Sequence, residues 1–364
     1  MIEDVILTTD NCRYCLMCRH VCPVGHVTRL ETLTPHGWGL TIASIRRGVA
    51  ELDESTVNVI YSCADCGTCR ANCITDQPLP SAIAAMRAEI TSKSLAPEAA
   101  YRIREKLENW RNPYGERPKP ETNGKGETAL FVGDDAHFLA PQTIDAVLTL
   151  LSAIEINPVL VGVGRNNGYL ASSIGFPEIA AGLMQETLDE LAAMGAKRML
   201  VLSPGDYYAF HQLHEDRNGI AWPENVKIQE VIPLLAEFLE SNELTFKQVS
   251  ANGSYAYVDP THSVRVPARF DAPRELLSAV MASAPLELFW RRERAHPCGN
   301  GGLQFTQPEI SSHLAYSRLD DGVKSGARIL YTEDPGSQAQ LARYANRFGL
   351  EVKNLYELLA MQLA

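Results

Sequence analysis

Short apolar runs bounded by glycine and proline recur in the C-terminal part of the chain. The runs 199–202 and 329–331 each follow a Gly-Ala pair, and a Pro-Gly pair comes shortly after each run. Continuous apolar runs of this length are typical of buried parallel strands, and proline is favoured in the first turn of a helix. Because such strands alternate with helical patterns, the sequence predicts two similar α/β lobes with small parallel sheets.

The same region repeats itself at a constant spacing along the chain. The recurring positions are Gly168, Pro177-Glu178-Ile179, Gly195-Ala196 and Pro204-Gly205, which return without an insertion as Gly299, Pro308-Glu309-Ile310, Gly326-Ala327 and Pro335-Gly336. The repeats also end alike, at 228–236 and 352–360. Agreement at many fixed positions indicates duplication. We therefore predict repeat 1 at 128–250 and repeat 2 at 251–364.

The N-terminal part has a different pattern. Helical apolar periodicity over 81–90 predicts a helix that closes a domain spanning residues 1–95, and within that domain 35–39 reads as a turn before a short helix at 40–48. Residues 112–126 are rich in Pro, Gly and charge, which predicts a linker over 96–127. The expected fold class is thus α+β multidomain, with a helical N-terminal domain followed by the two lobes.

The placement of the cysteines indicates metal binding, because eight of the nine lie between Cys12 and Cys73. They form two runs of spacing C-x2-C-x2-C-x3-C, namely Cys12, Cys15, Cys18, Cys22 and Cys63, Cys66, Cys69, Cys73. This spacing is typical of two-cluster ferredoxins, in which the fourth cysteine of each run binds the other cluster. The runs therefore predict two [4Fe–4S] clusters with crossed ligand sets. Cluster 1 takes Cys12, Cys15, Cys18 and Cys73, and cluster 2 takes Cys63, Cys66, Cys69 and Cys22.

Two structural zinc ions are the alternative for eight cysteines, but zinc sites usually present cysteines in pairs rather than triple runs. The formal net charge of −11 argues against a nucleic-acid partner. No apolar run is long enough to cross a bilayer, and the N-terminus lacks a signal-peptide pattern. We therefore expect a cytoplasmic protein without a membrane span of its own.

Other candidate residues carry weaker signals. One hypothesis is a mononuclear metal site made by His262, His296, Cys298 and Asp334, but a buried cysteine with two loop histidines explains the pattern better. A locally basic stretch is expected to form mostly a solvated face: Arg265, Arg269, Arg274, Arg291, Arg292 and Arg294. No Ser/His/Asp set, phosphate-binding loop or dinucleotide fingerprint stands out, so no catalytic residue is predicted.

The cysteine runs and the repeats together resemble the heterodisulfide reductase B/C-type family of iron–sulfur proteins, which includes subunits of anaerobic glycerol-3-phosphate dehydrogenase, glycolate oxidase and lactate-utilisation systems. In that family each repeat carries a Cys-Cys-Gly and further cysteines. Here these positions read Asn166-Asn167-Gly168, Ser203-Pro204-Gly205, Thr261 and Pro297-Cys298-Gly299. One remaining thiolate cannot hold a cluster that needs several. The resemblance thus implies that the scaffold of the repeats remains while their cluster chemistry is lost.

The resemblance implies an electron-transfer subunit of a larger oxidoreductase, without a substrate site of its own. The implied partners are a flavin-dependent dehydrogenase subunit and an electron-transfer flavoprotein or quinone-linked subunit, through which the chain would associate peripherally with a membrane. The alternative is a heterodisulfide reductase-type catalytic subunit with its active site in the C-terminal repeats.

Overall fold

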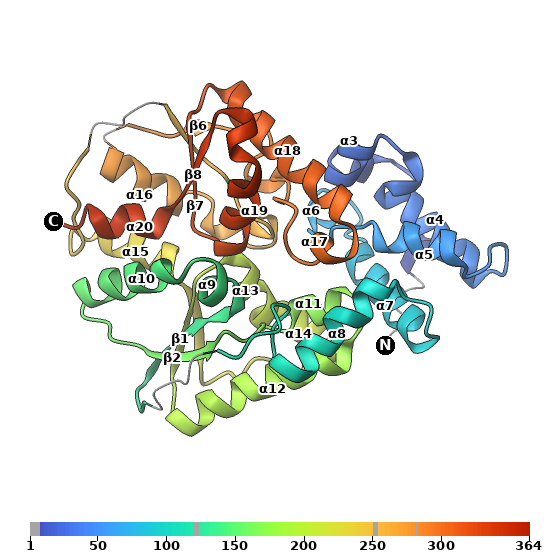
Figure 1. Cartoon of the computed structure of the whole chain (residues 1–364), viewed down its shortest axis with the longest axis horizontal. Coiled ribbons are helices and arrows are strands. Elements are labelled where there is room, and N and C mark those ends of the chain that lie inside the picture. The colour runs from blue at the N-terminus through green and yellow to red at the C-terminus, as the bar shows by residue number, and fades with distance from the viewer. Residues whose placement is uncertain (1–7, 119–123, 250–253, 282) are drawn as a thin grey trace.

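The computed structural model describes residues 8–118, 124–249, 254–281 and 283–364. It contains two four-stranded sheets, both entirely parallel (Figure 1). The strands are β1 (Thr128–Val132), β2 (Val159–Val163), β3 (Arg198–Val201), β4 (Lys227–Glu230), β5 (Tyr255–Tyr257), β6 (Leu286–Glu287), β7 (Ile329–Thr332) and β8 (Glu351–Asn354). The strand orders are β2-β1-β3-β4 and β6-β5-β7-β8. The predicted α+β class with two small parallel sheets is confirmed.

Helices connect the strands in both sheets, and we call the β1–β4 part lobe 1 and the β5–β8 part lobe 2. The helices of lobe 1 are α9 (Gly133–Leu139), α10 (Pro141–Ala153), α11 (Tyr169–Ser173), α12 (Pro177–Met194), α13 (Pro204–Tyr208), α14 (His214–Asn218) and α15 (Val231–Glu240). Those of lobe 2 are α16 (Ala272–Met281), α17 (Leu303–Thr306), α18 (Pro308–Ser325), α19 (Pro335–Ala345) and α20 (Leu355–Met361).

Helices α12 and α18 illustrate how the sequence sets these elements. They have the same length, and each begins with proline, whose fixed φ suits the first turn. Both end at a glycine in the left-handed region, Gly195 at φ 77° and Gly326 at φ 85°, where a Cβ would be strained. Their first residues, Pro177 and Pro308, are one of the residue pairs from which the sequence predicts a repeat.

One hydrophobic core lies between the two lobes. Helices α16, α20, α15 and α10 are stacked on the left side of the molecule in Figure 1, and their apolar side chains belong to a single buried cluster that draws on both lobes. Leu150 and Leu235 of lobe 1 and Leu276 and Leu359 of lobe 2 are fully buried in it. The two lobes therefore share a core.

The N-terminal part is helical and lies at one end of the molecule (Figure 1). Its helices are α2 (Met17–His20), α3 (Pro23–Thr28), α4 (Pro35–Arg46), α5 (Glu54–Tyr61), α6 (Thr68–Ala71), α7 (Leu79–Ser92) and α8 (Glu98–Trp110). The prediction of a turn at 35–39 is wrong, because α4 already begins at Pro35. The Thr34 hydroxyl accepts a hydrogen bond from Gly37 N at 3.3 Å and caps the helix there. Helix α8 lies within the range expected to be a linker.

The core of this N-terminal part continues into the lobes. Buried Trp38, Ile83 and Met86 belong to the same cluster as Leu170 of α11 and Leu303 of α17. The contact is also polar, since the buried Tyr61 hydroxyl donates to the Ile174 carbonyl at 2.9 Å. The N-terminal part is thus held against both lobes.

Candidate metal centre

The eight N-terminal cysteines line two neighbouring cavities. The first cavity is lined by Cys12, Cys15, Cys18, Cys69 and Cys73, with apolar neighbours such as Leu16 and Leu79. The second cavity is lined by Cys22, Cys63, Cys66 and Cys69, together with Trp38. Cys73 from the second run therefore faces the first cavity, and Cys22 from the first run faces the second. Cys69 borders both cavities, and the assignment of ligands to individual clusters stays a prediction.

The loops of the two runs have matching backbones. Tyr14 and Asp65 are in the left-handed region at φ 53° and 48°, and Leu16 and Gly67 follow at φ 62° and 86°. These turns direct amide groups toward sulfur: Tyr14 N lies 3.4 Å from Cys12 Sγ, and Asp65 N lies 3.3 Å from Cys63 Sγ. Short helices, α2 and α6, then begin at matching positions.

The fourth cysteine of each run is also fixed by local hydrogen bonds. Cys22 is the N-cap of α3, where its sulfur accepts from Gly25 N at 3.4 Å. Cys73 Sγ accepts from Gln77 N at 3.4 Å and lies 3.5 Å from the Thr75 hydroxyl. Amide and hydroxyl donors directed at sulfur are a recurring feature of iron–sulfur sites, where they tune the reduction potential.

The two cavities differ in burial. Cys22, Cys63 and Cys66 are buried, whereas Cys15 in the first cavity is exposed. Burial raises the pKa of the Cys63 thiol to about 12 and that of the Cys18 thiol to about 11. A metal ligand must be the thiolate, so a positively charged iron–sulfur core would supply the charge that these two thiols need to deprotonate. The donor set fits such a core.

Asp65, between two cysteines of the second run, is the centre of a buried ion network. Its carboxylate accepts from Arg217 Nη1 and Nη2 at 2.9 and 2.8 Å and from Arg265 Nη2 at 3.1 Å. Burial alone would raise the pKa of Asp65, but the charges of the two arginines hold it below its ordinary value. The network joins the cysteine loop to α14 of lobe 1 and to lobe 2.

Gly67 shows how closely this network packs. A Cβ at this position would lie 2.7 Å from the guanidinium carbon of Arg265, and its φ of 86° is disfavoured for other residues. Arg265 also lies 4.1 Å from the centre of the Tyr208 ring. The loop after Cys66 therefore needs a glycine to admit the arginine.

The basic stretch is not the solvated face that the sequence suggested. Arg265, Arg269 and Arg274 have side chains that are at most 8% exposed, and each pairs with a carboxylate. Arg274 Nη2, for example, lies 2.8 Å from Asp259 Oδ2. The prediction is wrong for these three because the fold brings buried carboxylates from outside the stretch against them, namely Asp65, Glu230, Glu333 and Asp259. Arg291 and Arg294 of the same stretch are exposed.

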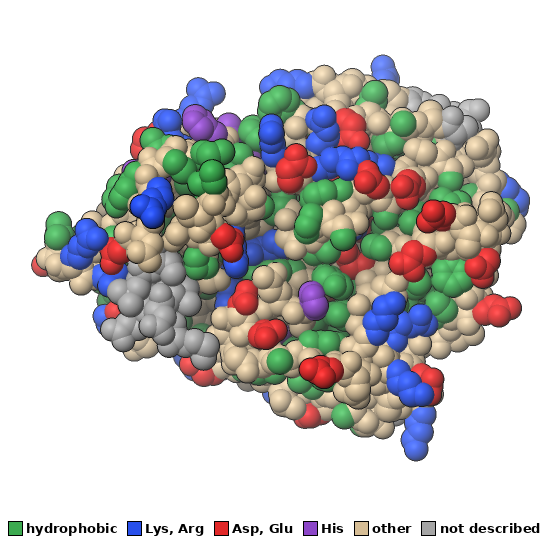
Figure 2. All heavy atoms as spheres, turned by 180° about the vertical axis from the view of Figure 1, so that it is seen from behind, with side chains coloured by type: hydrophobic (Ala, Val, Ile, Leu, Met, Phe, Trp, Pro, Cys, Tyr) green, Lys and Arg blue, Asp and Glu red, His purple; other side chains and the backbone are tan. Residues whose placement is uncertain are grey.

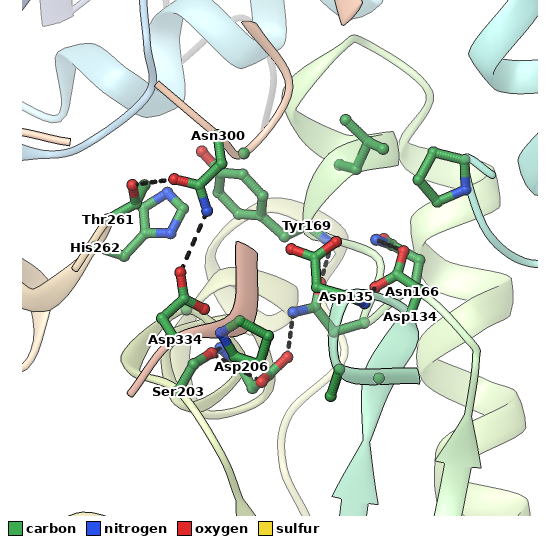
Figure 3. A pocket seen from close by; sticks show the side chains of 18 of the residues that line it. Asp134, Asp135, Asn166, Tyr169, Ser203, Asp206, Thr261, His262, Asn300 and Asp334 are labelled. Atoms are coloured by element: carbon green, nitrogen blue, oxygen red, sulfur yellow. Dashed lines mark hydrogen bonds between the residues drawn. The ribbon is translucent and has the colours of Figure 1, made fainter. Parts of the chain in front are cut away.

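A polar cleft lies between the lobes, at the carboxyl ends of β1, β3, β5 and β7 (Figure 3). Four carboxylates line it, and no lysine or arginine is among its described lining residues: Asp134, Asp135, Asp206 and Asp334. Burial raises the pKa of Asp206 to about 7. This cleft was not found from the sequence, since its acidic residues are scattered over separate segments of the chain.

Asn166 and Asn167, at positions where the resemblance predicts cysteines, bind two of these carboxylates. Asn166 Nδ2 donates to Asp134 Oδ2 at 2.9 Å, and Asn167 Nδ2 donates to Asp206 Oδ1 at 2.7 Å. No cysteine is among the described residues that line the cleft. The amides therefore fill a hydrogen-bonding role that is unlike cluster ligation.

Cys298 lies in the hydrophobic core of lobe 2, in a cluster that includes Ala315 and Leu319. His296 stacks on Trp290 with ring centres 4.0 Å apart, while His262 lies beside Tyr169 in the cleft. Among the residues that the structure describes, no group of three or more His, Cys, Asp and Glu side chains is arranged to hold a single metal ion.

On the face in Figure 2, acidic and basic side chains are interspersed rather than segregated. None of the helices in the described ranges combines the length and the apolar character needed to cross a membrane.

Residues 8–76 match the family model described as a 4Fe-4S dicluster domain. The chain is 23% identical over 337 residues to a Methanosarcina mazei protein that is named as a subunit of dihydromethanophenazine:CoB–CoM heterodisulfide reductase, covering 86% of this chain and 80% of that one. It is 20% identical to the protein of the same name from Methanosarcina acetivorans, covering 98% and 95%.

The fold also has a counterpart among solved structures. The crystal structure of a hypothetical protein from Helicobacter pylori superposes with a TM-score of 0.62 at 11% sequence identity. The match covers 93% of this chain and 71% of that one, so the arrangement of N-terminal helices and lobes is a shared fold.

Proposed function

This chain is a heterodisulfide reductase-like iron–sulfur protein, and from that premise we propose that it relays electrons through two [4Fe–4S] clusters as a subunit of a multi-subunit oxidoreductase. The observation that carries the proposal is the lining of two neighbouring cavities by eight cysteines. A [4Fe–4S] cluster, when bound, gains and releases one electron at a time.

The chain's own residues would hold and separate the two clusters. The predicted ligands of cluster 1 are Cys12, Cys15, Cys18 and Cys73, and those of cluster 2 are Cys63, Cys66, Cys69 and Cys22. The lining of the cavities supports this crossed assignment for Cys73 and Cys22. The exposed Cys15 would bring cluster 1 near a docked partner, whereas the buried Cys63 and Cys66 would keep cluster 2 from solvent.

The proposed donor or acceptor is a flavin-dependent dehydrogenase subunit, with an electron-transfer flavoprotein or a quinone-linked subunit on the other side. The relatives are named as a subunit of a reductase, which supports a role within a complex. We further propose a cytoplasmic location and an origin of the two lobes by duplication. Their identical strand orders and the matching starts of α12 and α18 support the duplication.

A catalytic subunit with an active site in the C-terminal repeats is the second candidate. One observation favours it: Tyr169 lines the cleft between the lobes, and its hydroxyl donates to the Asp65 carbonyl at 3.1 Å, beside the second cavity. A cleft lined by amides and carboxylates lacks the thiolates that an iron–sulfur active site requires. The electron-transfer function is therefore preferred.

Iron and sulfide analysis of protein purified without oxygen tests the proposal. Two cubane clusters predict about eight irons and eight acid-labile sulfides per chain. The protein is expected to be brown and to bleach on reduction. A colourless protein with two tightly bound zinc ions would refute the proposal.

A further inference from the structure

Three buried arginines converge on the loop that carries Cys63 and Cys66. Arg217 binds the Asp65 carboxylate through both terminal nitrogens, at 2.9 and 2.8 Å. Arg265 Nη2 donates to the Asp65 carbonyl at 2.7 Å, and Arg87 Nη2 donates to the Cys63 carbonyl at 2.7 Å. All three guanidinium groups therefore lie within one hydrogen bond of the wall of the second cavity.

The charges of this group do not cancel. Arg87 is 3% exposed, and the side chains of Arg217 and Arg265 are 5% and 7% exposed. Against these three positive charges the network contains one carboxylate, that of Asp65, which leaves two positive charges without a partner. Arg87 binds only carbonyl oxygens, including that of Ser173 at 2.8 Å. Buried, uncompensated positive charge thus lies directly behind the loop that lines the second cavity.

The first cavity has a different electrostatic environment. Among the described residues no arginine or lysine side chain donates a hydrogen bond to the Cys12–Cys18 loop, and Arg13, which lines the first cavity, is exposed to solvent. Water and salt screen exposed charges, whereas buried charges act through a medium of low dielectric constant. The two cavities therefore differ in charge as well as in burial.

We infer that Arg87, Arg217 and Arg265 raise the reduction potential of the centre in the second cavity, so that an electron leaving the first centre is gained by the second. The inference rests on the proposed function and adds the direction of internal electron flow. Reduction adds one negative charge, and nearby positive charge stabilises it. Burial opposes that added charge, but the same low dielectric constant strengthens its attraction to the three guanidinium groups. None of the three is a ligand, and all act through the field at the site.

A purely structural role for the network is the competing explanation, because the arginines also tie the loop to the lobes. The two explanations differ in the direction in which two substitutions should shift the reduction potential of the second centre. Arg217→Met removes a positive charge, whereas Asp65→Asn removes the negative charge and leaves the arginines in place. Asparagine tolerates the left-handed conformation that Asp65 adopts. Electrostatic tuning predicts that the two variants shift the reduction potential in opposite directions. Loosening of the loop does not predict opposite directions, because both substitutions weaken the same network.

The experiment is a redox titration of the full-length holoprotein, in which electron paramagnetic resonance resolves the two centres. In the wild type we expect the second centre to be reduced at the higher potential. Arg217→Met is expected to lower its ratio of reduced to oxidised form on the order of tenfold at a fixed potential, about 59 mV for one electron. Asp65→Asn is expected to raise the ratio, and neither variant is expected to move the first centre.

Arg217→Lys is the matched control, because it keeps the charge and loses the paired hydrogen bonds. It is expected to stay close to the wild-type potential. Arg265→Met supplies the same test where Arg217→Met does not retain eight irons. Shifts of the same sign in the Met and Asn variants, or a first centre that is reduced first in the wild type, would overturn the inference. A wild-type protein with fewer than two centres would instead refute the proposed function, and the inference with it.

Discussion

Replacing Arg269 by methionine is expected to destabilise the joined lobes strongly. Arg269 is 1% exposed and lies between two buried carboxylates, Glu230 at the end of β4 and Glu333 just after β7. Its Nε donates to Glu230 Oε1 at 2.9 Å, and its Nη2 donates to Glu333. Tyr257 donates to Glu333 Oε2 at 2.9 Å but carries no charge to offset the two carboxylates. The arginine thus links the two sheets.

The size of the destabilisation follows from the two buried carboxylates that lose their positively charged partner. Removing one partner of a buried ion pair costs about 3–5 kcal/mol, because the remaining charge is buried without compensation. For domains of roughly 150–250 residues that unfold together, each kcal/mol lowers the melting temperature by about 2–4 °C. Since the two lobes share a core, we expect a decrease of about 6–20 °C near pH 8.

The loss of stability in Arg269→Met is expected to be smaller at low pH than at high pH. Burial raises the pKa of Glu230 from 4.5 to about 7, and it also raises the pKa of Glu333. The folded state therefore holds protons that the unfolded state has released, so stability falls as pH rises from about 4.5 to 7. Without Arg269 the carboxylates protonate more readily, so the variant is expected to lose much less stability at pH 5 than at pH 8.

Thermal unfolding of the Arg269→Met protein, followed by circular dichroism at both pH values, measures this effect. Arg343→Met, on the exposed face of α19, is the control and is expected to match the wild type. Adding Glu333→Gln to Arg269→Met is expected to restore part of the loss at pH 8. A decrease below about 1 kcal/mol at pH 8, or an equal loss at both pH values, would refute the reasoning.

The cysteines and the contact between the N-terminal part and lobe 1 give three further predictions. Cys22→Ser is expected to disturb the centre of the second cavity and Cys73→Ser that of the first, as resolved by electron paramagnetic resonance; the reverse pattern would contradict crossed ligation. Cys298→Ala is expected to leave iron content unchanged, since this thiol lies in the core of lobe 2, and loss of iron on elemental analysis would contradict that. Tyr61→Phe is expected to lower the free energy of unfolding by about 1–2 kcal/mol, because the buried Ile174 carbonyl loses its hydrogen-bond donor. Tyr14→Phe, at an exposed position, is the control and is expected to have little effect in the same denaturation assay.

Features encoded by short stretches of sequence could be predicted. The apolar run 199–202 and the Pro-Gly after it correspond to β3 and the start of α13, and 329–331 corresponds to β7 in the same way. Helix α7, at Leu79–Ser92, contains the predicted helix at 81–90. In each case the signal is local, because apolar periodicity and a proline at the first turn act within a few residues.

Features that depend on distant partners could not be predicted. Asp65 stands between two cysteines, but its partners Arg217 and Arg265 are 152 and 200 positions away along the chain. Arg269 reads as part of a basic stretch, and only the fold reveals that Glu230 and Glu333 enclose it. A run of basic residues in a sequence does not show which arginines are buried. Burial depends on which strand ends, and which carboxylates at those ends, the fold brings beside each arginine.

The buried arginines also suggest what the two lobes contribute to the N-terminal centres. Asn166 and Asn167 hold carboxylates, so lobe 1 provides no thiolate at these positions. Yet lobe 1 supplies Arg217 and lobe 2 supplies Arg265, and both bind Asp65 on the loop that lines the second cavity. If these charges set the potential of that centre, the lobes act on electron transfer through their electrostatic field rather than through ligands. Loss of the lobes would then alter the N-terminal centres even with all eight cysteines present.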